Sequence, residues 1–279
     1  MTLEAIERLL IDADRSALWE LFHENSKTSF FEPHLLYKLW PSDETVVATM
    51  QQLHRVKPYG DFPKIALPAG KALPVVRRRF DDVIRRRHGA RAFSGGSMRV
   101  HELAKILWMS YGVNRANAKT HFPRPFRMIP SGGALYPLEL YVHASRVDGL
   151  DPGLYHYDPE AHNVDVLRQR DDSAEIAGLL IQPDLARAAA AVVFISAIFE
   201  RSTFKYGDRG YRFVLLEAGH LAQNVNLVAQ GLGLASVNIG GYNDRAVDRY
   251  LLCDGVNESV VYIALLGRPG KAAGGGHGV

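Results

Sequence analysis

Two near-continuous apolar runs constrain the fold of this 279-residue chain more than any other feature. They span residues 190–198 and 260–266, which is the usual length of a β-strand. A strand that is apolar along its whole length has both faces covered, so both runs are expected in the middle of a sheet. Residues 211–230 lie between them and carry an apolar stripe at three- and four-residue steps, which predicts a long amphipathic helix that ends at Gly231. The sequence therefore predicts a central sheet with helices packed on it.

Further elements follow from local patterns. Residues 138–144 are rich in β-forming residues, and residues 153–157 and 163–167 flank a polar turn, which predicts a strand and a hairpin. Helical periodicity is found over residues 3–22, 44–53 and 99–111. Ser97 is expected to cap the last of these helices, and Gly112 to end it.

The composition of the chain changes along its length. Residues 23–74 are irregular and contain six prolines, so residues 1–74 are interpreted as an N-terminal helical and loop extension on the core. The core domain is placed at residues 75–270. The glycine-rich residues 271–279 have little to bury and are expected to be a disordered tail.

Charge and composition exclude several classes of protein. The net charge is +3, from 33 basic and 30 acidic residues, which favours neither nucleic acid nor a membrane as partner. Cys253 is the only cysteine, so an intrachain disulfide is impossible and a cytoplasmic location is expected. The 11 histidines lack metal-ligand spacing, which argues against a zinc site. No dinucleotide-binding, P-loop or nucleophile-elbow motif is present.

The first candidate segment follows an arginine-rich helix. Arg87 and Arg91 are four residues apart, with Gly89 between them. Two cations and a glycine amide suit a terminal phosphate. A solvated polar helix end explains the same residues.

The second candidate segment directly precedes the strand at residues 138–144. It contains Pro130, Ser131, Gly132 and Gly133. Glycines allow the backbone to approach a flat ligand closely, and a serine hydroxyl can reach a heteroatom. A simple tight turn is the alternative.

The third candidate segment contains Lys205 and Tyr206, shortly before the long helix. An ammonium beside a phenol lowers the cost of forming phenolate, so the pair is a candidate for proton transfer. Surface charge with one half-buried tyrosine is the alternative.

Eight segments, in their amino-acid sequences and in their order along the chain, resemble the nitroreductase-like flavoproteins. Within these, they resemble the SagB-type dehydrogenase branch, which includes azoline oxidases. The segments are residues 23–27, 87–93, 130–139, 205–212, 216–220, 231–234, 239–242 and 266–269. The resemblance covers residues 75–269 well and the N-terminal extension weakly.

The resemblance implies an α+β fold with a mostly antiparallel sheet and FMN bound at a homodimer interface. Arg87, Gly89 and Arg91 then correspond to the phosphate site, with Arg127 and Arg268 as weaker candidates. Pro130, Ser131, Gly132 and Gly133 correspond to the segment against the flavin ring, and Gly240 and Gly241 to amides near its redox-active edge. Many relatives carry serine at the position of Gly89, so one hydroxyl donor is missing here.

The branch is thought to use a Lys-Tyr pair, matched by Lys205 and Tyr206, to remove a proton while an azoline is oxidised. The implied substrate is a thiazoline or oxazoline in a peptide or small molecule, and the implied partner is a cyclodehydratase. Two other functions stay open. One is a general NAD(P)H-dependent nitro or quinone reductase, and the other is a non-catalytic subunit that docks a peptide or a partner enzyme.

Overall fold

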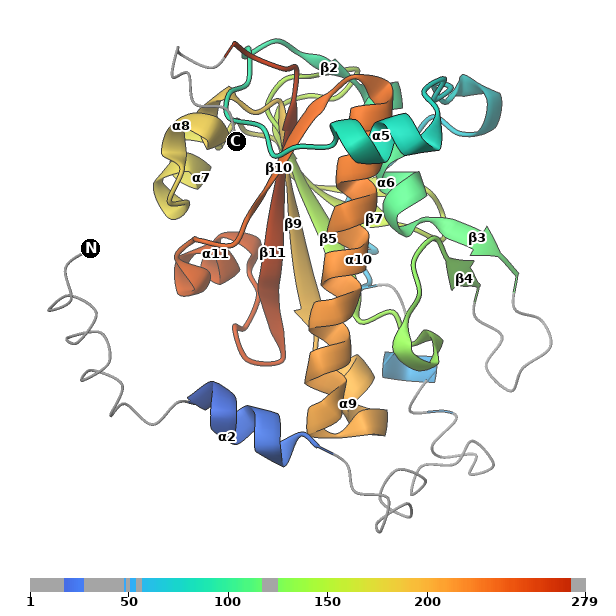
Figure 1. The fold of residues 1–279 in the computed structure, drawn as a ribbon, viewed down its shortest axis with the longest axis vertical. Helices are drawn as coiled ribbons and strands as arrows, with labels where there is room; N and C mark the ends of the chain where they lie inside the picture. The colour runs from blue at the N-terminus through green and yellow to red at the C-terminus, as the bar shows by residue number, and fades with distance from the viewer. Residues whose placement is uncertain (1–17, 28–47, 49–50, 54–56, 117–124, 272–279) are drawn as a thin grey trace, which may run out of the picture.

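In the computed structural model, a seven-stranded sheet forms the centre of the molecule (Figure 1). The structure describes residues 18–27, 48, 51–53, 57–116 and 125–271. The strand order is β1-β8-β7-β5-β9-β11-β10, and every neighbouring pair is antiparallel. The strands are β1 (Lys64–Ala66), β5 (Leu138–Ala144), β7 (Gly153–Asp158), β8 (Asn163–Arg168), β9 (Ala191–Ile198), β10 (Ala235–Ile239) and β11 (Glu258–Gly267).

The strands predicted from apolar runs are confirmed. β9 lies between β5 and β11, and its residues are buried on both faces of the sheet. Residues 138–144 form β5, and β7 and β8 form the predicted hairpin. The expected α+β architecture with an antiparallel sheet is therefore correct.

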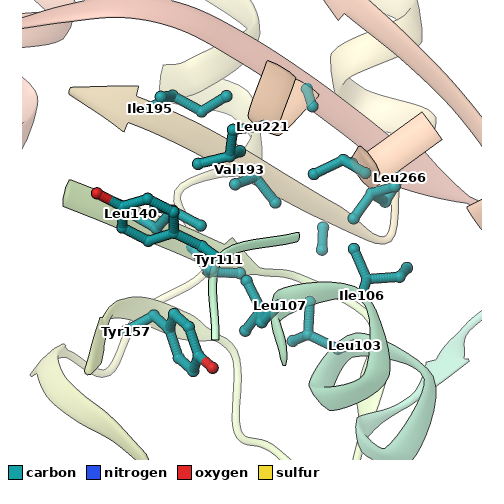
Figure 2. Close-up of a cluster of buried hydrophobic side chains, with 14 of the residues drawn as sticks. Leu103, Ile106, Leu107, Tyr111, Leu140, Tyr157, Val193, Ile195, Leu221 and Leu266 are labelled. Carbon is teal, nitrogen blue, oxygen red and sulfur yellow. The ribbon is translucent and has the colours of Figure 1, made fainter. Parts of the chain in front are cut away.

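One face of the sheet is covered by two helices, α6 (Val100–Tyr111) and α10 (Asp208–Leu232). Leu140, Val193 and Leu266 point from the strands into a core that Leu107 and Leu221 complete from these helices (Figure 2). The alternation of side chains along each strand sends Tyr141 and Phe194 to the opposite face.

The opposite face is covered by three shorter helices, α7 (Ser173–Leu179), α8 (Pro183–Ala188) and α11 (Asp244–Leu251). Ile176, Ala186 and Val247 pack there against Phe194 and Leu265. The sheet thus lies between two layers of helices, which explains why its central strands are apolar throughout.

The predicted start of one helix and the predicted end of another need correction. Gly112 follows α6 as expected, but Ser97 does not cap it, because the Ser97 hydroxyl donates to Asp148 (2.8 Å). The Arg99 amide donates instead to the Glu102 carboxylate (2.8 Å). α10 ends at Leu232 with Gly233 in the left-handed conformation, whereas Gly231 lies inside the helix.

The remaining elements are short. They are α2 (Leu18–Asn25), η2 (Gly70–Ala72), α5 (Phe80–Arg86), β2 (Met98–Arg99), β3 (Val113–Arg115), β4 (Phe126–Arg127), η3 (Gly132–Ala134), β6 (Val147–Asp148) and α9 (Glu200–Tyr206). β2 pairs in parallel with β6, and β3 pairs with β4.

The N-terminal segment contributes to the sheet, because β1 pairs with β8. Most of the predicted helices at residues 3–22 and 44–53, and most of the tail at residues 271–279, lie outside the described residues. The division into an extension, a core domain and a tail stays a prediction.

Candidate functional site

Lys205 and Tyr206 meet the glycine segment at Gly133. Gly133 has a positive φ of 65°, and a Cβ there would lie 2.6 Å from Tyr206 Oη and 3.2 Å from Lys205 Nζ. A Cβ on Gly132 would lie 3.2 Å from the Phe213 ring, which packs edge-on against Tyr206 with 5.0 Å between ring centroids. The second and third candidate segments therefore form one cluster in space.

The expected lowering of the Tyr206 pKa is not found. Burial of the phenol raises its pKa above the ordinary value. A raised pKa keeps the hydroxyl protonated at neutral pH, so Tyr206 is a proton donor in this structure.

Glu217 lies behind the glycine segment, on α10. Its side chain is buried, and its Oε1 has no hydrogen-bond partner among the described residues. Burial raises the pKa of Glu217 to about 8, although a hydrogen bond from Ser131 and the charge of Arg127 act in the opposite direction. Ser131 Oγ also accepts from the Tyr136 amide (2.9 Å).

Arg127 is buried beside this group, with 7% of its surface exposed. Its guanidinium carbon lies 4.3 Å from the Tyr111 ring centroid and 5.0 Å from that of Tyr136. The guanidinium therefore lies between two aromatic rings. The backbone amide of Arg127 also donates to the Tyr136 hydroxyl (2.9 Å). Arg127 lines a cavity of about 570 Å³ together with Pro130, Ser131 and Gly133.

The first candidate segment lies against the edge strand β10. Arg87, Gly89 and Arg91 are exposed, and the Ala90 amide donates to the Ser236 carbonyl (2.8 Å). A Cβ on Gly89 would meet only Val237 Cγ2, at 3.6 Å, so the backbone there is open to a ligand.

Arg268 is engaged within the protein. Its two terminal nitrogens donate to the two carboxylate oxygens of Glu102 (3.1 and 2.8 Å), and its Nε donates to the Ser97 carbonyl (2.9 Å). The structure thus gives Arg268 a role in holding the end of β11 to the start of α6.

Gly240 and Gly241 directly follow β10. A Cβ on Gly241 would lie 2.2 Å from Ile181 Cδ1, and the Gly241 carbonyl accepts from the Ile181 amide (3.1 Å). A side chain at position 241 would therefore require the exposed Ile181 side chain to move. The neighbouring Asn238 has a buried Oδ1 that no described residue contacts by a hydrogen bond.

Two of the three predicted cofactor segments lie near opposite ends of α10: Gly132 faces Phe213 in its first turns, and residues 87–91 follow α5, which lies beside its last turns (Figure 1). α9 lies at the first turns of α10, whereas the segment around α5 reaches its last turns, where Arg78 donates to the Gln230 carbonyl (3.1 Å). α10 has 25 residues. At 1.5 Å per residue, its axis is about 37 Å long.

Both segments fit the parts of a flavin nucleotide. Exposed cations beside an open glycine suit a phosphate, and the glycine turn with the buried, unpartnered Glu217 Oε1 behind it suits a flat ligand with hydrogen-bonding edges. Sequence reasoning did not assign Glu217 to the site. Its signal was weak, because a glutamate on a helix is usually exposed.

Within residues 18–27, 48, 51–53, 57–116 and 125–271, no cluster of histidine, cysteine or carboxylate side chains could hold a metal ion. The helices in these ranges are too short or too polar to span a bilayer.

Sequence comparison finds a relative that matches more than half of the chain. The chain is 35% identical over 192 residues to the "Putative nitroreductase MJ1384" of Methanocaldococcus jannaschii, covering 69% of this chain and 91% of that relative. It is 33% identical over 134 residues to the microcin B17-processing protein McbC of Escherichia coli, covering 46% of this chain. The match spans 49% of McbC, about half of its length.

Solved structures show the same fold. A "putative nitroreductase" from Anabaena variabilis superposes with a TM-score of 0.64 at 26% identity, covering 82% of this chain and 48% of that chain. A chain of the E. coli microcin synthetase McbBCD complex, bound to truncated pro-MccB17, superposes with a TM-score of 0.56 at 22% identity, covering 88% and 99%. The family model of the nitroreductase family matches residues 84–268, from α5 to the end of the sheet. The chain therefore belongs to the nitroreductase family, as its sequence motifs predicted.

Proposed function

We propose that this protein is an FMN-dependent oxidoreductase of the SagB-type branch, which dehydrogenates thiazoline or oxazoline rings to azoles. The observation that carries the proposal is the convergence of Lys205 Nζ and Tyr206 Oη on Gly133. A pair of proton-transferring groups beside a glycine turn is what ring oxidation requires, because a carbon-bound proton must leave while a flat acceptor lies close by. The similarity to McbC, a microcin B17-processing protein, supports the same function.

The cofactor would be held by the three predicted segments. Arg87, Gly89 and Arg91 would bind the phosphate, and residues 130–133 would contact the flavin ring. Gly240 and Gly241 would place their backbone amides near the redox-active edge of that ring. FMN, when bound, supplies the acceptor for the hydride equivalent that leaves the ring carbon next to the deprotonated one.

The proton is handled by the chain itself. Since Tyr206 keeps its proton at neutral pH, the phenol donates a hydrogen bond to the substrate or to its neighbour. Lys205 would accept the proton from the azoline carbon. The C–H electron pair stays in the ring and becomes part of the new double bond.

We further propose that a second copy of the chain completes the site. Residues 87–91 and residues 130–133 lie near opposite ends of α10. In a twofold dimer, residues 87–91 of one protomer could lie beside residues 130–133 of its partner. α10 also exposes apolar side chains, with Leu215 at 43% and Leu216 at 60% exposure. A helix that presents these leucines to solvent is suited to a dimer interface.

The proton-transfer role is tested with two single variants. Lys205→Ala and Tyr206→Phe are each expected to retain bound flavin, measured by absorbance, and to lose oxidation of a thiazoline peptide by about a hundredfold or more. Lys71→Ala and Tyr155→Phe are matched controls, because Lys71 is exposed and the Tyr155 hydroxyl donates to the Asp151 carbonyl (2.6 Å), away from the site. Parental turnover in both test variants would refute the role.

A second function is favoured by one comparison. The relative from M. jannaschii, which is named a nitroreductase, matches over 91% of its length. Anaerobic mixing separates the two functions. Rapid bleaching of the flavin by NAD(P)H, with no response to a thiazoline peptide, would establish the reductase. A colourless protein that binds no FMN would instead support a docking subunit.

Association with a cyclising enzyme is a further part of the proposal. It is supported by the likeness in fold to a chain of the McbBCD complex, which was solved with a pro-peptide bound. A cytoplasmic location also stays a prediction.

A further inference from the structure

The cavity beside Arg127 has the composition of an anion site. Its volume is about 570 Å³, and two guanidinium groups lie in its lining. Apolar and aromatic side chains form most of the remaining wall. The lining residues used in the argument are Arg115, Phe126, Arg127, Ile129, Pro130 and Tyr136.

Arg127 is a buried cation that forms no direct ion pair within the described residues. Among the described residues, no carboxylate lies within ion-pairing distance of its guanidinium, and no acceptor receives a hydrogen bond from it. Its contacts are the faces of Tyr111 and Tyr136, which leave the edge of the guanidinium plane for other partners. Burial acts against the charge, but the Tyr111 hydroxyl and the more distant carboxylates of Glu139, Glu160 and Glu217 together raise the pKa of Arg127, so its guanidinium is charged. An anion in the cavity would give this charge a direct partner.

Arg115 adds a second cation at the same cavity. Its guanidinium carbon lies 4.4 Å from the Phe126 ring centroid, and no ion pair joins it to a carboxylate in the described part of the chain. Glu217 does not neutralise the pair, because burial raises its pKa to about 8 and keeps it uncharged at pH 7. The cavity is therefore positively charged and half apolar.

We propose that this cavity binds a carboxylate on a flat, ring-shaped substrate, with Arg127 as the buried donor and Arg115 as the outer cation. The geometry suits a bidentate guanidinium–carboxylate contact, with the ring of the ligand against Phe126 and Tyr136. Combined with the proposed function, on which this step rests, the substrate class becomes an azoline that carries a free carboxylate. A thiazoline peptide belongs to this class when the azoline is its C-terminal residue, because an azoline followed by another residue bears an amide in place of the carboxylate.

The same chemistry could serve another anion, the phosphate of FMN. Arg127 was a weaker phosphate candidate in the sequence, so the experiment must separate a substrate carboxylate from a cofactor phosphate. Binding of simple probes does this without any turnover.

The first measurement uses the unmodified, FMN-supplemented protein. Isothermal titration calorimetry compares thiazole-4-carboxylate with thiazole-4-carboxamide, which has the same ring and no charge. We expect the carboxylate to bind at least about tenfold more tightly, as one hydrogen-bonded ion contact predicts. Equal affinities would overturn the proposal without any variant being made.

The second measurement uses substitutions at the cations. Arg127→Gln is expected to weaken carboxylate binding by about tenfold to a hundredfold and to leave carboxamide binding unchanged. Arg127→Lys keeps the charge in the same place and should retain part of the preference. Arg85→Gln is the matched control, because Arg85 is an exposed arginine of α5 that pairs with Asp82 (2.8 Å). An Arg127→Gln protein that keeps the full preference would contradict the proposal.

A third measurement identifies the source of the anion. Affinities for FMN and riboflavin are compared in the parent and in Arg127→Gln. If the variant loses affinity for FMN alone, with carboxylate binding intact, Arg127 serves the cofactor phosphate and the proposal is wrong. If the carboxylate binds as expected and no azoline is oxidised, the proposed function fails while the anion site stands.

Discussion

Gly133 allows the Tyr206 hydroxyl to lie close to the backbone of the candidate site. Its φ of 65° is left-handed, and a Cβ would come within 2.6 Å of Tyr206 Oη. We expect Gly133→Ala to displace the Tyr206 phenol and to lower turnover of a thiazoline peptide at least about tenfold, while flavin stays bound.

The matched control for this substitution is Gly178→Ala. Gly178 lies in α7, and no atom comes within 4 Å of the point that a Cβ would occupy there. Alanine should therefore stabilise the helix by about 0.5–1 kcal/mol and leave turnover unchanged. Turnover and thermal unfolding of both variants decide the matter. An unaltered Gly133→Ala enzyme would show that the phenol is not needed where the structure has it.

Glu217 makes stability depend on pH in a direction unusual for a carboxylate. Burial raises its pKa in the folded protein to about 8, from an ordinary value of 4.5. Between these values the folded state holds one more proton than the unfolded state. The free energy of unfolding therefore decreases as pH rises, by up to about 1.4 kcal/mol per pH unit, and levels off above about pH 8.

Urea unfolding at pH 5.5, 7 and 8.5 measures this effect. We expect Glu217→Gln to lose that part of the pH dependence and to become more stable than the parent at pH 8.5. Glu160→Gln, at an exposed position of the β7–β8 turn, is the control and should follow the parent. A parent and a Glu217→Gln variant with parallel pH profiles would place the pKa of Glu217 in its ordinary range.

Single residues were predictable from the sequence where a motif carried them. Lys205, Tyr206 and Gly133 were each identified, because their neighbours in the chain form recognisable segments. Glu217 was not assigned to the site, and the relation of Arg127 to it was missed. Their significance comes from burial against Ser131, Tyr111 and Tyr136, which residue spacing along the chain does not encode.

At the scale of elements, Arg268 joins two of them. Its guanidinium contacts both oxygens of Glu102, and so links the end of β11 to the first turn of α6. We expect Arg268→Gln to destabilise the flavin-free protein by about 1–3 kcal/mol, since it leaves the largely buried Glu102 carboxylate with fewer partners. Chemical unfolding of the flavin-free protein measures this.

The same variant tests the sequence-based role of Arg268. A loss of FMN affinity at unchanged stability would support the weaker phosphate assignment and contradict the structural link. Arg99→Gln provides a comparison, because Arg99 donates to the same carboxylate (3.2 Å) from an exposed position and should cost less than about 1 kcal/mol.

Elements with long apolar patterns and the β7–β8 hairpin with its polar turn were predicted well, whereas several short elements were missed. β5, β9 and α10 have apolar patterns that extend over many residues, so their positions were close to those observed. The edge strands β1 and β10 and the helices α7, α8 and α11 were missed. They are at most eight residues long, and their conformation depends on the sheet that they pack against.

At the scale of the whole molecule, the central question is assembly. If α10 forms the interface, Leu216→Glu places a charge where the two copies meet. We expect this variant to be monomeric in light scattering and to lose most of its bound flavin, since each site would then be incomplete.

Val256→Glu is the control, because Val256 is 83% exposed and lies in the loop between α11 and β11. It should keep the parental mass and flavin content. A Leu216→Glu protein that remains dimeric with full flavin would exclude this face of α10 as the interface.

The pairing of β1 with β8 has a consequence for how this protein can be shortened. β1 lies within residues 1–74, which the sequence assigned to an N-terminal extension on the core, yet it occupies the outermost position of the sheet. Cutting the chain at residue 75 would strip the amide and carbonyl groups of β8 of their covering strand. Such a fragment would expose β8 as an unpaired edge strand, which can pair with the same strand of another copy. Poor solubility of the fragment would then reflect aggregation through this edge and not damage to the candidate site.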